Sequence, residues 1–360
     1  MKPQHIMIAL LTVALYWMYL LYQPFLLTIM IAALLAVSTS SLQRRLEQQS
    51  GSVLFASVVS TLSLAILFFA PLGYFLTTFT LQFSNVDVLT LEQFYLQLQD
   101  LATHLPPYLS FLEPWVHDSL DELEINKLAK HTLTIAGTIG SYSAGFLKNA
   151  LLIIIFYFFS HFYGKTIFAY FRRIIQLPLQ DATLLSLELS SVMSVVFYSI
   201  LTTAVFEGAL FGIVVAFMGF NGLLFGIMYG FASLIPVVGG ALMWVPFAIY
   251  ELSQGHSGNA FFIALYSIVV ISIFADTIVK PIIIKEINFR IVKTNAKMNE
   301  LLIFFSIIAG LSAFGFWGMI LGPAITAFFL ALLKLIDMRQ KIENAQGKVL
   351  PSELEALKKL

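Results

Sequence analysis

Three ionisable side chains stand out because they fall within or at the end of long apolar stretches. Glu207 lies near the middle of segment 198–219, and Asp276 and Lys280 lie four residues apart where segment 259–279 ends. Ionisable groups at membrane depth are costly and mark paths for ions or solutes. Glu207 is therefore a candidate for ion coupling, with a hydrogen bond between helices as the alternative. Asp276 and Lys280 share one helix face and can pair, either in coupling or as an interfacial salt bridge.

A second set of residues interrupts the apolar sequence. The run SLIPVVGGALMWVP at 233–246 lies in a stretch without charge from Gly208 to Tyr250, and GLSAFGFWGMILGPAIT at 310–326 lies in a similar one, 301–333. Proline costs a helix interior about 3 kcal/mol and glycine about 1 kcal/mol. Broken helices of this kind hold solute in transporters; a kink used only for packing is the alternative. The breaks predict a permeation path lined by Pro236, Gly239, Gly240, Pro246, Gly315, Gly318, Gly322 and Pro323.

Signatures of enzymes are missing from the sequence. It has no H-E-x-x-H, G-x-S-x-G or G-x-x-x-x-G-K-[ST] motif, the patterns of metalloproteases, serine hydrolases and nucleotide-binding loops. The chain has no Cys, and its six His show no metal-ligand spacing. His161 is expected at the membrane interface, with a proton relay as the alternative. We therefore expect no enzyme, no metal and no cofactor.

The composition indicates that the chain is surrounded by lipid. Of 360 residues, 59% are hydrophobic and only 11% are charged, whereas soluble domains carry roughly 25% charged residues. A soluble protein with so few charges would expose apolar surface and aggregate. The net charge of zero gives no sign of nucleic-acid binding. The sequence predicts an all-α integral membrane protein, a polytopic helical bundle in the lipid bilayer.

Apolar runs and one acidic segment divide the chain. A membrane-spanning helix needs about 20 apolar residues, and 6–22 and 25–40 are expected to form a helical hairpin that turns around Pro24. Eight of the twenty acidic residues fall in 82–131, which predicts a subdomain outside the membrane. The predicted divisions are N-terminal transmembrane helices 1–81, the acidic extracytoplasmic subdomain 82–131, a transport core 132–337 with broken hairpins 222–252 and 299–335, and a cytoplasmic tail 338–360.

The basic residues predict the orientation, because Lys and Arg favour cytoplasmic loops. The chain has four basic regions, at 44–45, 165–173, 280–297 and 334–341. Placing all four inside puts both termini in the cytoplasm and makes 222–252 begin and end outside. Its length of about 31 residues is too short for two full spans, which need roughly 40 residues plus a turn. Residues 301–333 must likewise begin and end inside. Two hairpins entering from opposite faces predict an inverted repeat.

The same residues resemble the autoinducer-2 exporter family, also called PerM-like permeases. The family core reads I-P-x-x-G, a proline ten residues after the first, D-x-x-x-[KR]-P, and F-G-x-x-G-x-x-x-G-P. The specific resemblance covers about residues 198–335, and Glu207 is not part of the family pattern. The matching positions are Pro236, Gly239, Pro246, Asp276, Lys280, Pro281, Phe314, Gly315, Gly318, Gly322 and Pro323.

The resemblance implies a transporter of the cell inner membrane that assembles as a homo-oligomer. Its members are associated with export of the signal autoinducer-2 and with sodium(lithium)/proton antiport, so the implied solute is small and polar, or a monovalent cation or proton. We expect a secondary transporter that works by alternating access. A passive channel and a non-transporting membrane scaffold, with the acidic segment as its binding module, are the alternatives.

Overall fold

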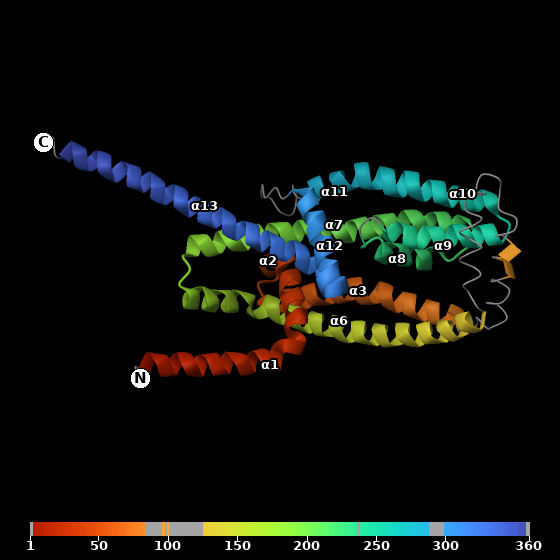
Figure 1. Ribbon diagram of the computed structural model, residues 1–360, viewed down its shortest axis with the longest axis horizontal. Helices are drawn as coiled ribbons and strands as arrows, with labels where there is room; N and C mark the ends of the chain where they lie inside the picture. The colour runs from red at the N-terminus through yellow and green to blue at the C-terminus, as the bar shows by residue number, and fades with distance from the viewer. Residues whose placement is uncertain are drawn as a thin grey trace. The chain divides into compact units, whose positions relative to one another are not determined.

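The computed structural model of the protein describes residues 3–83, 96–97, 99–100, 125–235, 238–287 and 299–357. All regular elements in this part of the chain are helices, and six helical segments are long and apolar enough to cross a membrane (Figure 1). The fold is therefore that of an all-α polytopic membrane protein, as predicted. In chain order the elements are α1 (Pro3–Ser38), α2 (Ser40–Ser50), α3 (Val53–Phe83), α6 (Ile125–Ile175), α7 (Leu179–Phe217), α8 (Gly222–Ala232), α9 (Gly239–Ser253), α10 (Ser257–Tyr266), the π-helical segment η2 (Ser267–Val279), α11 (Lys280–Ile287), α12 (Glu300–Phe314), the 3₁₀ turn η4 (Gly315–Trp317) and α13 (Gly318–Leu357).

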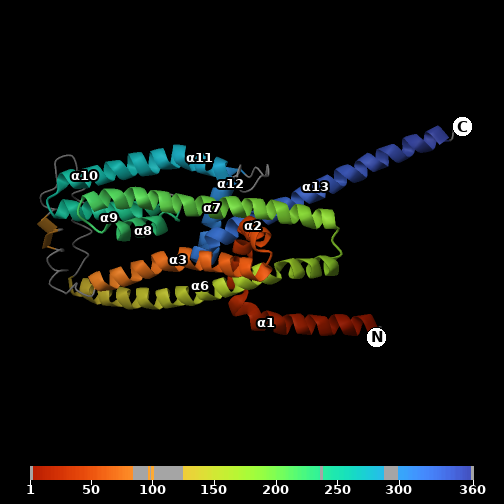
Figure 2. The ribbon, with the colours of Figure 1, turned by 180° about the vertical axis from the view of Figure 1, so that it is seen from behind.

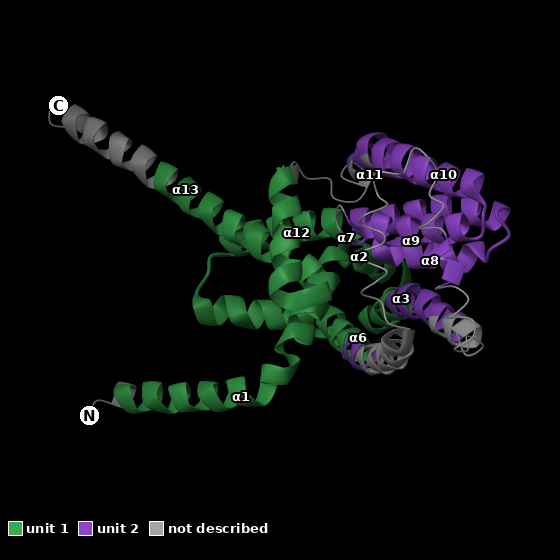
Figure 3. Ribbon diagram, turned by 45° about the vertical axis from the view of Figure 1, so that its right-hand side comes forward, with its two compact units in different colours: residues 1–62, 150–197, 288–360 green, residues 63–149, 198–287 purple. Residues whose placement is uncertain are grey.

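The first helix differs from the prediction. The expected hairpin of 6–22 and 25–40 is wrong, because α1 is one helix of 36 residues that continues through Pro24. Membrane helices tolerate proline where local adjustments satisfy the freed backbone groups, and α1 changes direction along its length (Figure 3). The chain instead leaves the helical region at Thr39 (φ −96°, ψ 8°), directly before α2.

The chain forms two compact units, each assembled from segments distant in sequence (Figure 3). Unit 1 holds Met1–Leu62, Ala150–Phe197 and Asn288–Leu360. Within it, α12 and α1 pack against α13, and ion pairs from Lys334 to Glu188 and from Arg339 to Asp181 join α13 to α7. Fully buried side chains of this unit include Ile31, Leu35, Ala56, Met193 and Leu321.

Unit 2 holds Ser63–Asn149 and Tyr198–Ile287. Its core is built around Phe211 of α7, whose ring stacks on Tyr229 of α8 with 4.6 Å between centroids and meets Phe247 of α9 edge-on. Each such aromatic pair contributes about 0.5–1.5 kcal/mol beyond its buried area. The same cluster takes in Ala260, Ile263 and Ile271, so α10 and η2 close this core.

Several helices have other boundaries than those predicted. The span predicted at 198–219 belongs to a longer helix, α7, and the predicted tail from 338 continues α13 as helix to Leu357. Most of the predicted acidic subdomain, 82–131, lies outside the described residues.

Candidate functional site

The first predicted break separates two short helices of unit 2. α8 ends at Ala232 and α9 begins at Gly239, and Pro236 between them lies outside the described residues. Pro246 lies inside α9 and does not interrupt it. Among the described residues of 222–252, the helix is therefore interrupted at one place, between Ala232 and Gly239.

The glycines at this break are packed against their own hairpin. A Cβ added to Gly239 would overlap the backbone carbonyl of Ala232, and one added to Gly240 would lie 2.6 Å from the Tyr229 hydroxyl oxygen. Small residues allow helix backbones to approach closely in lipid. Close packing within the hairpin therefore explains the glycine at position 239. Packing was the alternative to a solute site in the sequence prediction.

A seam of four further glycines joins α7 to α8. A Cβ on Gly208 would lie 2.5 Å from the Gly226 carbonyl oxygen, and Gly212 and Gly222 would each overlap the other's carbonyl. The four positions recur every fourth residue in both helices, which puts each pair on one face. This seam was not predicted, although the four-residue spacing of its glycines is visible in the sequence.

The second break, in unit 1, depends on one glycine conformation. Gly315 follows α12 with φ 64° and ψ −154°, a region that essentially only glycine occupies. A Cβ there would meet nothing within 4 Å, so Gly315 is open to its surroundings. The helix therefore ends here because Gly315 adopts a backbone conformation that other residues rarely reach.

The remaining predicted residues of this hairpin are in close contact. A Cβ on Gly318 would overlap the Gly310 carbonyl, and one on Gly322 would overlap the Ser306 carbonyl, while Pro323 is buried in α13. The glycines of α12 and α13 therefore form a second seam. The two hairpins belong to different units, and the prediction that they line one path stays a prediction.

Glu207 is buried in α7, with 7% of the residue exposed. Phe211, one turn further along the helix, is fully enclosed by the aromatic core. Burying an ionised carboxylate costs several kcal/mol unless it is paired, hydrated or neutralised. This burial fits both an ion-coupling role and a hydrogen bond between helices, and the coupling role of Glu207 stays a prediction.

Asp276 and Lys280 lie where a π-helical segment passes into an α-helix. The Lys280 backbone N–H donates to the carbonyl of Ala275, five residues back, so the winding here is wider than in the α-helix assumed for their pairing. Such π-helical turns occur frequently at functional sites. The Asp276 side chain lies outside the described part, and its pairing with Lys280 stays a prediction.

A second buried carboxylate of unit 2 has a structural setting. Glu251 is 2% exposed, and its Oε2 accepts a hydrogen bond from Asn259 Nδ2 at 2.9 Å and faces His256 Nδ1 at 3.3 Å. These residues straddle the turn from α9 to α10. Glu251 therefore holds two consecutive helices together.

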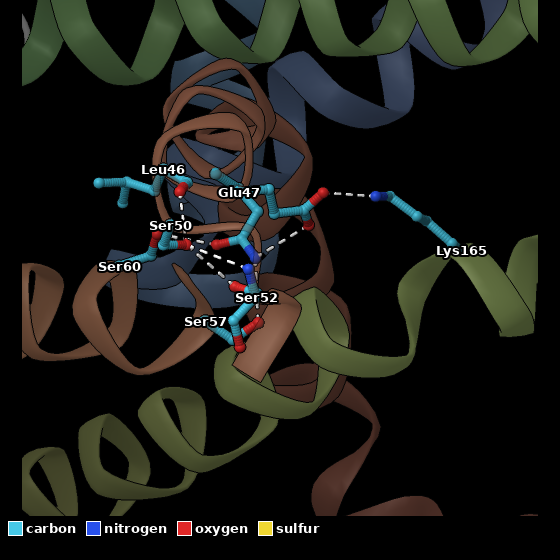
Figure 4. A network of polar contacts seen from close by, with 8 residues as sticks. Leu46, Glu47, Ser50, Ser52, Ser57, Ser60 and Lys165 are labelled. Carbon is cyan, nitrogen blue, oxygen red and sulfur yellow. Dashed lines mark hydrogen bonds and ion pairs between the residues drawn. The ribbon is translucent and has the colours of Figure 1, made fainter. Parts of the chain in front are cut away.

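Unit 1 contains a closed polar network around Gln43 of α2 (Figure 4). Gln43 Nε2 donates to Ser57 Oγ (3.0 Å) and Glu47 Oε1 (3.2 Å), and its Oε1 accepts from Ser60 Oγ (2.9 Å). Glu47 also pairs with Lys165 of α6 at 2.5 Å. Burial alone would raise the pKa of Glu47, but the hydrogen bonds from Lys165 and Gln43 hold that pKa below its ordinary value.

The break at Thr39 is held by residues of α6. The Thr39 hydroxyl lies 2.7 Å from the Tyr157 hydroxyl and 3.1 Å from His161 Nε2, and it donates to the Leu35 carbonyl. His161 is buried within the protein, with 8% of the residue exposed, and its expected position at the membrane interface stays a prediction. Because Thr39 has one proton to donate and donates it to Leu35, Tyr157 and His161 must act as donors to it.

No group of three or more potential metal ligands occurs in the described part of the chain. The long apolar helices define a polytopic α-helical membrane protein. The sequence matches the family described as "AI-2E family transporter" over residues 6–338. The chain belongs to this family, and is thus a membrane transport protein.

Similar proteins carry the same general name. Two from Helicobacter pylori, strains 26695 and J99, each named "Putative transport protein", are 39% identical over 351 residues (96% of this chain, 99% of the relative) and 342 residues (94% and 96%). A protein of that name from Aquifex aeolicus is 33% identical over 109 residues, 30% of this chain and 28% of its own. No solved structure matches the chain.

Proposed function

We propose that the protein is a secondary transporter of a small polar solute or monovalent cation, working by alternating access and coupled to protons or sodium through Glu207. Autoinducer-2-like export and sodium/proton antiport are the two candidate activities. The burial of Glu207 within a long apolar helix carries the proposal, because an intramembrane carboxylate is expensive and functional by default. Asp276 is the second candidate for coupling.

The packing of the hairpin glycines refines which of them can face a solute. Gly239, Gly318 and Gly322 each lie against a backbone carbonyl, whereas Gly315 has open space beside it. A glycine with open space lets a solute approach the backbone. We therefore assign the solute-facing role to Gly315, and a packing role to the other three.

The proposed location is the inner membrane, with both termini in the cytoplasm. Within unit 1, α1 begins and α13 extends toward the same end as the turn between α6 and α7 (Figures 1 and 3). Arg172 and Arg173 precede that turn, and basic residues favour the cytoplasmic side. Because α1 is one helix and not a hairpin, placing the N-terminus and the α6–α7 turn on one side requires that α1 does not cross the membrane completely. The family resemblance supports a homo-oligomer.

Flux measurements on purified protein in proteoliposomes test the proposal. Vesicles loaded with a pH indicator receive a sodium gradient, and parallel vesicles receive autoinducer-2. The proposal expects saturable flux that depends on the ion gradient. Flux that does not saturate would indicate a channel. No flux, together with loss of a cellular phenotype when 82–131 alone is deleted, would indicate a scaffold.

A further inference from the structure

Hydroxyl groups in the helices of this protein normally bond to their own helix. Six examples donate to a carbonyl three or four residues earlier: Thr28, Ser38, Thr61, Thr77, Ser306 and Thr326. Ser199 and Thr203 of α7 and Ser267 at the start of η2 do not. They are 8%, 7% and 0% exposed, and their hydroxyl oxygens have no hydrogen-bond partner among the described residues.

Two of these hydroxyls share a helix face with Glu207. Residues 199, 203 and 207 recur every four positions along α7, so they line one face over about 12 Å at 1.5 Å per residue. Phe211 continues the row and packs on Tyr229 and Phe247. The row therefore ends in the sealed aromatic core and extends from Glu207 toward the start of α7.

Ser267, the third of these hydroxyls, lies on a different helix at the start of η2. Its chain neighbour Tyr266 donates a hydrogen bond of 3.3 Å to the carbonyl of Leu210, which lies one turn from Glu207. The helices α7 and α10–η2 run antiparallel side by side (Figures 1 and 2). Ser267 thus lies near the level of Glu207, and Asp276 further along η2 lies toward the Ser199 end.

A buried hydroxyl without a partner is unfavourable, and ordered water is the usual partner of buried polar groups that the protein does not satisfy. A carboxylate also needs water, or a chain of hydroxyls, to gain and lose a proton. We propose that Ser199, Thr203 and Ser267, the hydroxyl row, line a water-accessible path that carries protons to and from Glu207. This inference rests on the proposed coupling role of Glu207.

Cysteine accessibility tests the path directly, because the native chain has no Cys. Ser199→Cys, Thr203→Cys and Ser267→Cys are treated with a small charged methanethiosulfonate in proteoliposomes. The matched control is Ser306→Cys, since Ser306 is also 7% exposed but its hydroxyl bonds to the Ile303 carbonyl. We expect the three row variants to react about ten-fold faster than the control, because only a hydrated thiol ionises to the reactive thiolate. Equal rates would overturn the path.

A second measurement tests the path even if one of the cysteine variants does not fold. Infrared difference spectra of the otherwise native protein identify the Glu207 carboxyl band by its loss in Glu207→Gln. We expect this band to shift within minutes of transfer to D₂O, and an unshifted band would overturn the path. The proposed function fails separately: wild-type coupling in Glu207→Gln would remove Glu207 from the mechanism whatever the labelling rates are.

Discussion

One buried polar cluster in each unit makes an instructive comparison. In unit 1 the Gln43 amide uses both its donor and acceptor groups on Ser57, Ser60 and Glu47. In unit 2 the hydroxyls of Ser199, Thr203 and Ser267 are also buried, but they have no hydrogen-bond partner among the described residues. A closed network holds helices in place, whereas open hydroxyls need water or a solute. We therefore expect a structural role for the Gln43 network of unit 1 and a functional one for the hydroxyl row of unit 2, although Glu251 of unit 2 is itself bonded to Asn259.

The energies involved support that distinction. Each buried polar group left unsatisfied costs about 1–3 kcal/mol, and total stabilities are only about 5–15 kcal/mol. Three dry hydroxyls in one unit would therefore take up much of the stability of the fold. Water bonded to the hydroxyl row would remove this free-energy cost.

The largest effects should come from the glycine seams, because each unit contains one. Gly322→Val in unit 1 and Gly212→Val in unit 2 place a side chain on a backbone carbonyl, and we expect each to lower the free energy of unfolding by about 3 kcal/mol or more. Thermal unfolding in detergent measures this. Gly73→Val is the control, because a Cβ there meets nothing within 4 Å. A large loss in one unit only would show that the units differ in packing and not just in polar groups.

Removal of the Gln43 amide should be the next most severe change. Gln43→Leu leaves Ser57 and Ser60 buried without their partner, so we expect a loss of about 3 kcal/mol in the free energy of unfolding. Denaturation monitored by tryptophan fluorescence measures it. An unchanged stability would mean that water replaces the amide, and the network would then not be closed.

The matching change in unit 2 should do little to stability. Thr203→Val removes a hydroxyl that bonds to no described residue, and we expect a change below about 1 kcal/mol in either direction. Gradient-driven flux should fall nevertheless, since the row loses one of its water sites. A loss of stability as large as that of Gln43→Leu would indicate that Thr203 is paired, and would break the comparison.

The smallest effect concerns the pH dependence of unit 1. Because the pKa of Glu47 is lowered by Lys165 and Gln43, its pairing stabilises the fold above the ordinary Glu pKa of about 4.3 and is lost as pH falls through the lowered value. Glu47→Gln should therefore be less stable than the native protein at pH 7, by less than about 1 kcal/mol for this exposed pair. The two proteins should converge in acid. A gap that widens in acid would contradict the assignment.

Local sequence signals predicted the helices and the breaks, because they act within a few residues. Gly315 breaks a helix through its own backbone, and apolar length alone marks the spans. The prediction of a hairpin at Pro24 was wrong, because neighbouring groups can satisfy the backbone carbonyl that loses its hydrogen bond at a proline. The Gln43 network was not predictable, since apart from Glu47 its members Ser57, Ser60 and Lys165 lie fourteen to more than a hundred residues from their partners. Ser199 and Thr203 look like ordinary small helix residues, and only the structure distinguishes them.

Gradient-driven flux in Glu207→Gln tests the central claim most directly. Vesicles containing the native protein, Glu207→Gln or the control Glu251→Gln are loaded with a pH indicator and given a sodium gradient, with autoinducer-2 uptake followed in parallel. Glu251 is a fair control because it is a buried carboxylate of the same unit that bonds to Asn259. We predict that Glu207→Gln folds and elutes like the native protein but loses gradient-dependent flux, while Glu251→Gln retains it. Native flux in Glu207→Gln would contradict the account.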